Sequence, residues 1–288
     1  MKLPIVLIAF DRPDYFEQCC EALSLQADGR DVYLFQDSPW HMSQVDNTDN
    51  NVSVFRKYFP SGRLYVSESN FGVGFNTKAA RETVFKSHDA AVFIEDDLVL
   101  SPWYMDMMDE LEDQFRDDNR IGMVNGYCGA VKGIGNSVQH QKENIDKFVA
   151  MEHTLAPILW AKKYEIIKPI LYEYYDLLKH DNYIRRPHNK ILRFWNSKGV
   201  VDTQKIVTSQ DCATVLSMLL NNQIKISTAT NNLLYIGVRG VHSTRAAYDN
   251  YGWDKFPVYP EKTSGYSLTE DEILQIRNQI HKKYGLSV

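Results

Sequence analysis

Residues 90–102 read Ala-Ala-Val-Phe-Ile-Glu-Asp-Asp-Leu-Val-Leu-Ser-Pro, an apolar run that stops at the three carboxylates Glu95, Asp96 and Asp97. A continuous apolar run of this kind is typical of a strand buried on both faces of a parallel sheet. Three adjacent carboxylates repel one another, and a divalent cation would offset their charge. A solvated acidic turn is the alternative, but the position directly after a buried strand favours a site for Mn²⁺ or Mg²⁺.

The chain before this run alternates between predicted strands and helices. Strands are expected over residues 4–10, 31–36 and 63–67, helices over 15–25, 54–59 and 76–86, and a polar loop over 40–51. Asp14 is expected to cap the first helix. This alternation predicts right-handed crossovers and a doubly wound parallel sheet.

Two of these strands also end in polar residues. Asp11 and Arg12 follow the first strand, and Asp37 follows the second. Ligands of doubly wound sheets bind at the carboxyl ends of the strands. We therefore expect these residues to form one site with residues 95–97.

The second half of the sequence is less regular. The pattern predicts helices over 102–115, 163–179, 211–221 and 269–284, a strand over 121–124, a glycine-rich loop over 126–135 and a mobile polar segment over 136–150. No repeat or linker divides the chain, so we expect one domain with two halves, about 1–130 and about 131–288.

Composition excludes several classes of protein. With 288 residues, 44% of them hydrophobic, and a net charge of −5, the chain has enough apolar material for a large core. The mild acidity argues against a protein that coats nucleic acid. Aromatic residues make up 12% of the chain and either line pockets or pack the core.

Cysteine spacing and the N-terminal segment bear on the compartment. Cys19, Cys20, Cys128 and Cys212 fit neither a disulfide framework nor a zinc site, which favours reduced thiols. The apolar run before Asp11 is too short to span a membrane or to act as a signal peptide. We therefore expect a cytoplasmic protein without a membrane span.

Residues 71–76, Phe-Gly-Val-Gly-Phe-Asn, place two glycines before a predicted helix. Free backbone N–H groups there could bind a phosphate or ribose, with Lys78 and Arg81 adding charge, but a simple tight turn fits the spacing equally well. Neither a P-loop nor a Gly-x-Gly-x-x-Gly fingerprint is present. P-loop kinases and dinucleotide oxidoreductases are therefore excluded, and the lack of a Gly-x-Ser-x-Gly elbow leaves acyl transfer without support.

Two single residues have both a structural and a functional interpretation. Asp211 precedes an apolar helix, where the helix dipole favours a carboxylate, or it is a general base. From spacing alone the structural interpretation is favoured. His242 lies in a glycine-flanked loop, residues 237–243, without a second histidine to form a zinc pair.

Residues 4–13, 34–38 and 90–102 together resemble a GT-A glycosyltransferase, and within that fold the N-acetylglucosaminyltransferase I family, whose metal motif has a Glu-Asp-Asp version. The resemblance covers residues 4–130 and continues more loosely through 155–160, Asp211 and 237–243. It implies an α/β fold of the GT-A (Rossmann-like) type, a mostly parallel sheet flanked by helices in a single large domain. The first half would bind the nucleotide sugar, and the second half with its C-terminal helix would bind the acceptor.

The resemblance also implies an activity, a metal-dependent inverting transfer from a UDP-sugar of the UDP-Glc or UDP-GlcNAc type to a hydroxyl. Asp97 would bind Mn²⁺ (or Mg²⁺), Asp211 would be the catalytic base, and His242 would assist the diphosphate. The remaining donor-binding residues would be Arg12 at the nucleotide, Asp37 at the uracil ring, Asn76 and Lys78 near uridine or its diphosphate, and Glu95 and Asp96 at the sugar and ribose.

One departure from the family concerns the acceptor. Gln210 and Cys212 flank Asp211 where the family has Asp and Trp, so an N-glycan mannose is not expected. A microbial or viral polysaccharide, a lipid-linked glycan or a modified nucleobase remains. A basic and aromatic stretch over residues 183–205 leaves hydroxymethylated DNA of a virus open, but a solvated surface is favoured.

Two other activities are alternatives. A nucleotidyltransferase of the same fold would need an N-terminal glycine-rich loop, which residues 9–12 lack. A nucleotide-sugar-binding module without catalysis would keep the sheet but transfer nothing.

Overall fold

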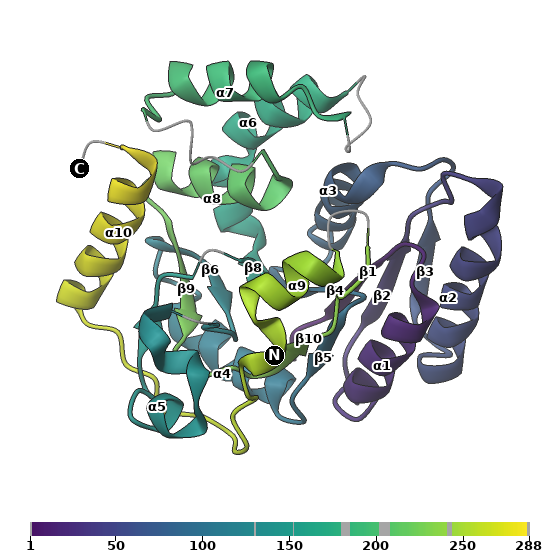
Figure 1. The fold of residues 1–288 in the computed structure, drawn as a ribbon, viewed down its shortest axis with the longest axis horizontal. Coiled ribbons are helices and arrows are strands. Elements are labelled where there is room, and N and C mark those ends of the chain that lie inside the picture. Colours follow the sequence, from purple (N-terminus) through teal and green to yellow (C-terminus); the bar gives the residue numbers. More distant parts are fainter. Residues whose placement is uncertain are drawn as a thin grey trace.

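The computed structural model describes residues 2–129, 131–151, 153–179, 185–201, 208–240 and 244–286. A central sheet of eight strands runs in the order β3-β2-β1-β4-β8-β6-β9-β7 (Figure 1). Its strands are β1 (Ile5–Ala9), β2 (Val32–Gln36), β3 (Arg63–Val66), β4 (Ala90–Glu95), β6 (Ile121–Asn125), β7 (Phe148–Val149), β8 (Ile158–Trp160) and β9 (Ile224–Thr228).

The four strands of the first half are parallel, as the sequence predicts. Ile5 of β1 pairs with Val32 of β2 and with Val92 of β4. The second half adds β6 and β9 as a parallel pair, while β8 and β7 run antiparallel to their neighbours. The sheet is therefore mostly parallel, and the expected α/β class is confirmed.

A small second sheet joins the two halves. Strand β5 (Leu98–Leu100) follows the acidic triplet directly and pairs antiparallel with β10 (Leu233–Tyr235). Beyond β10, Ile236 donates a backbone hydrogen bond of 2.9 Å to the carbonyl of Asp97. A segment almost 140 residues later in the sequence is thereby fixed against the end of β4.

Helices surround the sheet. They are α1 (Pro13–Ser24), α2 (Val45–Tyr58), α3 (Gly72–Val84), α4 (Tyr104–Phe115), α5 (Val138–Lys142), α6 (Ala161–Leu178), α7 (His188–Ser197), α8 (Gln210–Leu220), α9 (Arg245–Tyr251) and α10 (Glu270–Tyr284). Thr269 and Glu272 form the expected capping box of α10. In the described part of the chain, no helix is both long and apolar enough to cross a membrane.

Several predicted boundaries were wrong. Helix α1 begins at Pro13, whose fixed φ suits the first helical position, and Asp14 lies in its first turn instead of capping it. Helix α2 begins at Val45, inside the expected loop, because its polar sequence still buries Asn51 and Phe55. The segment expected to be a mobile polar stretch contains α5 and β7.

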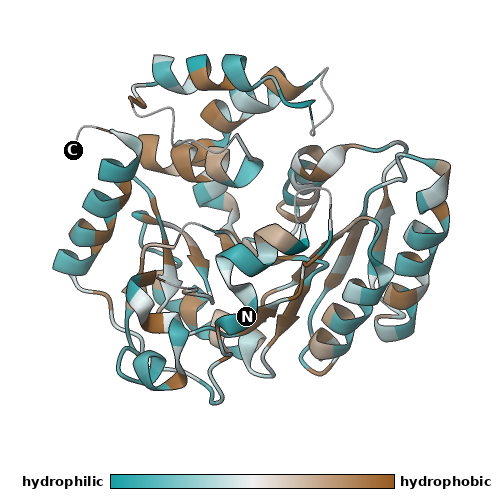
Figure 2. Cartoon of the chain, in the orientation of Figure 1, coloured by the Kyte–Doolittle hydropathy of each residue, from teal (hydrophilic) through white to brown (hydrophobic). Residues whose placement is uncertain are grey.

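One continuous hydrophobic core extends from Leu3 in the first half to Tyr284 in the second. In Figure 2 the strands are mostly hydrophobic, and the outer faces of α2 and α10 are hydrophilic. Because the two halves share this core, the chain forms a single domain, as expected.

Candidate functional site

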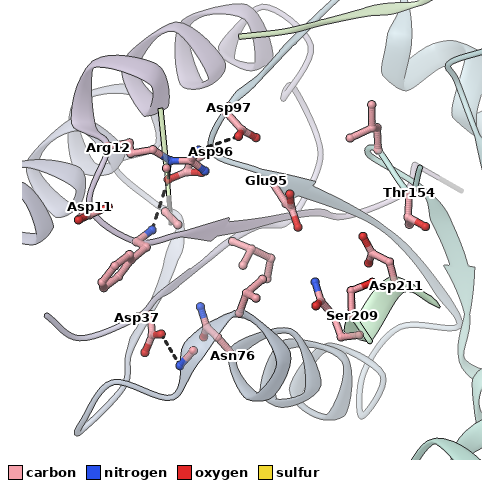
Figure 3. Close-up of a pocket in the computed structure, with 18 of the residues that line it drawn as sticks. Asp11, Arg12, Asp37, Asn76, Glu95, Asp96, Asp97, Thr154, Ser209 and Asp211 are labelled. Carbon is pink, nitrogen blue, oxygen red and sulfur yellow. Dashed lines mark hydrogen bonds and ion pairs between the residues drawn. The ribbon is translucent and has the colours of Figure 1, made fainter. Parts of the chain in front are cut away.

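A cavity of about 570 Å³ opens at the carboxyl ends of β1, β2 and β4. The N-terminal end of α8 and residues 153–155 form its opposite wall (Figure 3). Of the residues predicted for the site, the cavity is lined by Arg12, Asp37, Asn76, Glu95, Asp96, Asp97 and Asp211.

Arg12 lies between two of the three adjacent carboxylates. Its guanidinium forms ion pairs with Asp96 and, at 2.8 Å, with Oδ2 of Asp97. Both aspartates are almost fully buried, with 2% and 3% of their surface exposed. Arg12 therefore supplies a built-in positive charge that offsets part of the repulsion within the triplet.

Asp97 still has one oxygen to offer. Its Oδ1 is buried and has no hydrogen-bond partner among the described residues. Burial raises the pKa of Asp97 to about 6, although Arg12 acts in the opposite direction. Within the described ranges, no three His, Cys, Asp or Glu side chains already form a metal cage. Asp97 would thus present an oxygen ligand from this strand end.

The loop after β10 covers this charged cluster. A Cβ atom on Gly237 would lie 2.3 Å from Oδ2 of Asp97, and one on Gly240 would lie 3.1 Å from Arg12. Arg12 also donates a hydrogen bond of 3.3 Å to the carbonyl of Arg239. Glycine at position 237 is therefore required for the loop to approach Asp97 this closely.

Asp37 organises the other end of the cavity. It accepts backbone hydrogen bonds of 2.8 Å from Phe71 and Gly72, at the start of α3. Ser38, Ser67 and Asn70 donate three more. The glycine-rich segment 71–76 is thus the capped first turn of α3, and its N–H groups at 71 and 72 are bound to Asp37 rather than open to a phosphate. A hydrogen bond from Asp37 to uracil stays a prediction.

Asn76 lines the same end, where its side chain donates to the carbonyl of Phe35. Lys78, expected near the diphosphate, lies outside the cavity lining. Its ammonium binds Glu82 at 2.9 Å and lies 4.4 Å from the ring centre of Tyr172. Position 78 is on the face of α3 that packs toward α6, where Lys78 contacts Tyr172. Asn76, two positions earlier, is on a different face of the same helix, so its closeness in sequence does not bring Lys78 to the cavity.

Asp211 and Glu95 face each other across the cavity in Figure 3. Burial raises the pKa of Glu95 well above its usual range, and the nearby Asp211 and Asp97 raise it further. Burial also raises the pKa of Asp211, while Lys225 and Arg81 lower it. A carboxylate with a raised pKa is a stronger base, so the functional interpretation of Asp211 gains a physical basis.

The local sequence explains how Asp211 reaches the cavity. Ser209 caps α8 by accepting a hydrogen bond from the backbone of Cys212, which places Asp211 in the first turn. The rest of α8 carries no charged side chain and is almost entirely buried. Only the first turn of this helix therefore projects a charged group into the site.

The structure adds lining residues that sequence reasoning missed, among them Thr154, Tyr235 and Trp253, and it brings in Arg186 from the basic and aromatic stretch. The first three come from loops and from distant elements, so no spacing marked them. His242, the remaining predicted donor-binding residue, lies outside the described residues.

The basic and aromatic stretch is described only in part, over residues 185–201. Trp195 is fully buried and stacks on Tyr174, with ring centres 6.1 Å apart. It is therefore a core residue and cannot stack on a nucleobase.

No protein-family model and no curated protein matches the sequence. Among solved structures, the chain is similar to the glycosyltransferase GlyE of Streptococcus pneumoniae TIGR4, with 16% identity, a TM-score of 0.42, and coverage of 79% of this chain and 45% of that one. It is also similar to the galactosyltransferase LgtC, with 12% identity, a TM-score of 0.42, and coverage of 99% and 97%.

A third similar structure is glucosyl-3-phosphoglycerate synthase from Mycobacterium tuberculosis in complex with Mn²⁺, UDP-glucose and glycerol 3-phosphate. The identity is 11%, the TM-score 0.39, and the coverage 99% of this chain and 82% of that one. At TM-scores below 0.5 these likenesses carry no argument about the reaction.

Proposed function

We propose that this chain is a metal-dependent, inverting glycosyltransferase that moves a sugar from a nucleotide sugar, a UDP-sugar in the first instance, to an acceptor hydroxyl. One observation carries the proposal. A single cavity holds the Arg12–Asp96–Asp97 cluster on one wall and a carboxylate with a raised pKa, Asp211, on the opposite wall. The space between them suits a sugar whose leaving group meets the cluster and whose acceptor meets the base.

The residues of this chain fit one divalent cation. Mg²⁺ and Mn²⁺ prefer oxygen ligands, and such ions are commonly held by one or two carboxylates together with substrate phosphates. Oδ1 of Asp97 is a buried oxygen that is available for that purpose. When bound, the cation would act as a Lewis acid that stabilises negative charge on the departing diphosphate.

The reaction follows from the placement of the side chains. Asp211 accepts the proton of the acceptor hydroxyl, whose oxygen forms a bond to the anomeric carbon. The bond from that carbon to the diphosphate breaks, and its electron pair leaves with the phosphate oxygen. Because Asp211 and the Asp97 cluster lie on opposite walls, attack comes from the face opposite the leaving group, and the anomeric configuration inverts.

The two halves of the chain would bind different substrates. Asp37 and Asn76 hold the nucleoside end of the cavity in shape, so residues up to about 130 would bind the donor and residues from about 131 the acceptor. The four cysteines are buried and form no disulfide, which supports the proposal of a reducing compartment such as the cytoplasm. Trp195 of the basic and aromatic stretch is buried and unavailable for stacking, while Arg186 of the same stretch lines the cavity.

A thermal-shift panel of nucleotide sugars, with and without Mn²⁺, tests the proposal. We expect stabilisation by one class of nucleotide sugar that depends on Mn²⁺ and is lost in Asp97→Ala. The exposed Asp113→Asn serves as the control and should behave as the wild type. A panel without any shift, or a shift retained in Asp97→Ala, would contradict the assignment.

A further inference from the structure

A second cavity, of about 430 Å³, adjoins the first. Its walls come from Gly129, Val131 and Lys132, from α8 and β9, and from α9 and α10. Helices α8 and α10 both pack on β9 and lie beside it in Figure 1. The residues with a role in the proposed reaction line the first cavity and not this one.

All the charged side chains among its described lining residues are basic. They are Lys132, Lys225 and Lys283, and His153 is the remaining titratable side chain apart from two tyrosines. No Asp or Glu occurs among the described residues that line it. In a chain with a net charge of −5, three lysines around one cavity create a local field that favours an anion.

The two cavities meet where the base lies. His153 and Trp253 line both of them. On α8, Asp211 lines the first cavity and Val215, one turn later on the same face, lines the second. The second cavity therefore adjoins the wall of the first cavity that carries Asp211.

Lys225 connects the two cavities electrostatically. It is buried, with 2% of its surface exposed, and donates hydrogen bonds of 3.0 and 3.2 Å to the carbonyl of His153 and the hydroxyl of Thr154. The same ammonium lowers the pKa of Asp211. A positive charge is thus fixed close to the base on the side from which the acceptor would enter.

Trp253 provides an apolar surface at the junction. Its ring centre lies 4.7 Å from those of Tyr235 and His153, so neighbouring rings fix its orientation. Rigid aromatic faces are a common lining of small-molecule sites, and they suit the apolar face of a sugar ring.

We propose that the second cavity is the acceptor subsite and that it takes a sugar carrying an anionic group, a phosphate or a carboxylate. The sugar ring would lie against Trp253 with one hydroxyl directed to Asp211, and the anion would lie among the lysines. The assignment of this cavity as an acceptor site rests on the proposed transferase function. The preference for an anionic sugar rests on the lining alone.

Calorimetric titrations without donor test this preference. The probes are glucose 6-phosphate, glucuronate and neutral methyl glucoside, and the first two distinguish phosphate from carboxylate. We expect at least one anionic sugar to bind about tenfold more tightly than methyl glucoside. Lys283→Gln should lose about that factor, the low end for a hydrogen bond to a charged group.

Lys282→Gln is the matched control, because Lys282 is the exposed neighbour on α10 and does not line the cavity. It should bind as the wild type does, and both variants should melt at the wild-type temperature. Equal affinity for neutral and anionic sugars, equal losses in the two variants, or no binding to any of the three sugars would overturn the proposal. Binding only to a single-stranded oligonucleotide would overturn it as well.

Failure of the transferase function would be seen separately. If wild-type protein binds the anionic sugar through Lys283 but releases no nucleotide from any nucleotide sugar, the anion site stands and the proposed reaction does not.

Discussion

The two cavities share Trp253 and His153 but have opposite charge. Among the described residues, six carboxylates line the first cavity together with the cations Arg12 and Arg186, whereas the charged lining described for the second is entirely lysine. A divalent cation is attracted to the first cavity and an anion to the second. Asp211, the proposed proton acceptor, lies between the acidic lining of the first cavity and Lys225 of the second.

The two cavities also differ in how their charge is held. In the first, Arg12 is locked between Asp96 and Asp97 and the loop at Gly237 closes over them. In the second, Lys132 is exposed and Lys283 half-buried, while Lys225 alone is fully buried. The charged side chains of the first cavity are therefore held in place before a ligand binds. In the second cavity, Lys132 and Lys283 can change their side-chain conformation to suit a ligand.

The largest effect is expected from Arg12→Met, which removes the counter-ion of two buried carboxylates. Breaking a buried ion pair in this way costs about 3–5 kcal/mol of unfolding free energy. The control is Arg239→Met, whose ion pair with Asp14 is exposed and should contribute about 1 kcal/mol or less. Urea unfolding measures both, and equal losses in the two variants would show that the Arg12 cluster is no more than a surface pair.

The effect of Mn²⁺ on the melting temperature of Arg12→Met gives a second test of the cation site. In Arg12→Met the two aspartates lack their cation, so Mn²⁺ should raise the melting temperature more than it does in the wild type. No difference between the two proteins would argue against a cation site at Asp97.

A smaller effect is expected from Gly237→Ala. The new methyl group would lie 2.3 Å from Asp97 and 2.4 Å from the Tyr235 hydroxyl, so either the loop or these two side chains must shift. We expect about a tenfold loss of affinity for the nucleotide sugar in the presence of Mn²⁺, equivalent to about 1.4 kcal/mol. Gly240→Ala, whose methyl group would lie 3.1 Å from the end of the flexible Arg12 side chain, should lose less. The reverse order would place the critical contact elsewhere.

The smallest effect concerns the carboxyl Glu95. Because its pKa in the folded protein is raised, the cost of ionising it is absent below its unfolded pKa of about 4.5 and grows as the pH rises. Glu95→Gln should therefore raise the melting temperature at pH 7, on the order of 2 °C. The gain should shrink toward pH 4.5. A gain that is independent of pH would exclude this electrostatic cause.

How far the sequence could predict the molecule differs between its two halves. Continuous apolar strands and the polar residues after them predicted β1, β2 and β4 and brought Arg12, Asp37 and the acidic triplet together. The short antiparallel strands β7 and β8 leave too few residues for a period-2 pattern, so they were missed.

The site residues, too, were easier to predict in the first half of the chain than in the second. Side chains at the ends of strands were placed well, because strand order fixes where they meet. Asn76 lines the cavity and Lys78 does not, because side chains two positions apart on a helix point to different faces. Trp253 and Lys225 were missed because their approach to Asp211 depends on long-range packing that no local spacing encodes.

The most direct test of the account is the rate of nucleotide release from a nucleotide sugar in the presence of Mn²⁺ and a sugar acceptor, compared between the wild type and Asp211→Asn. We predict a fall of about 10²–10⁴-fold, the contribution of a positioned general base, with unchanged affinity for the donor by calorimetry. Asp176→Asn, an exposed residue on α6, should behave as the wild type. Turnover by Asp211→Asn at the wild-type rate would contradict the assignment of the base and with it the proposed site.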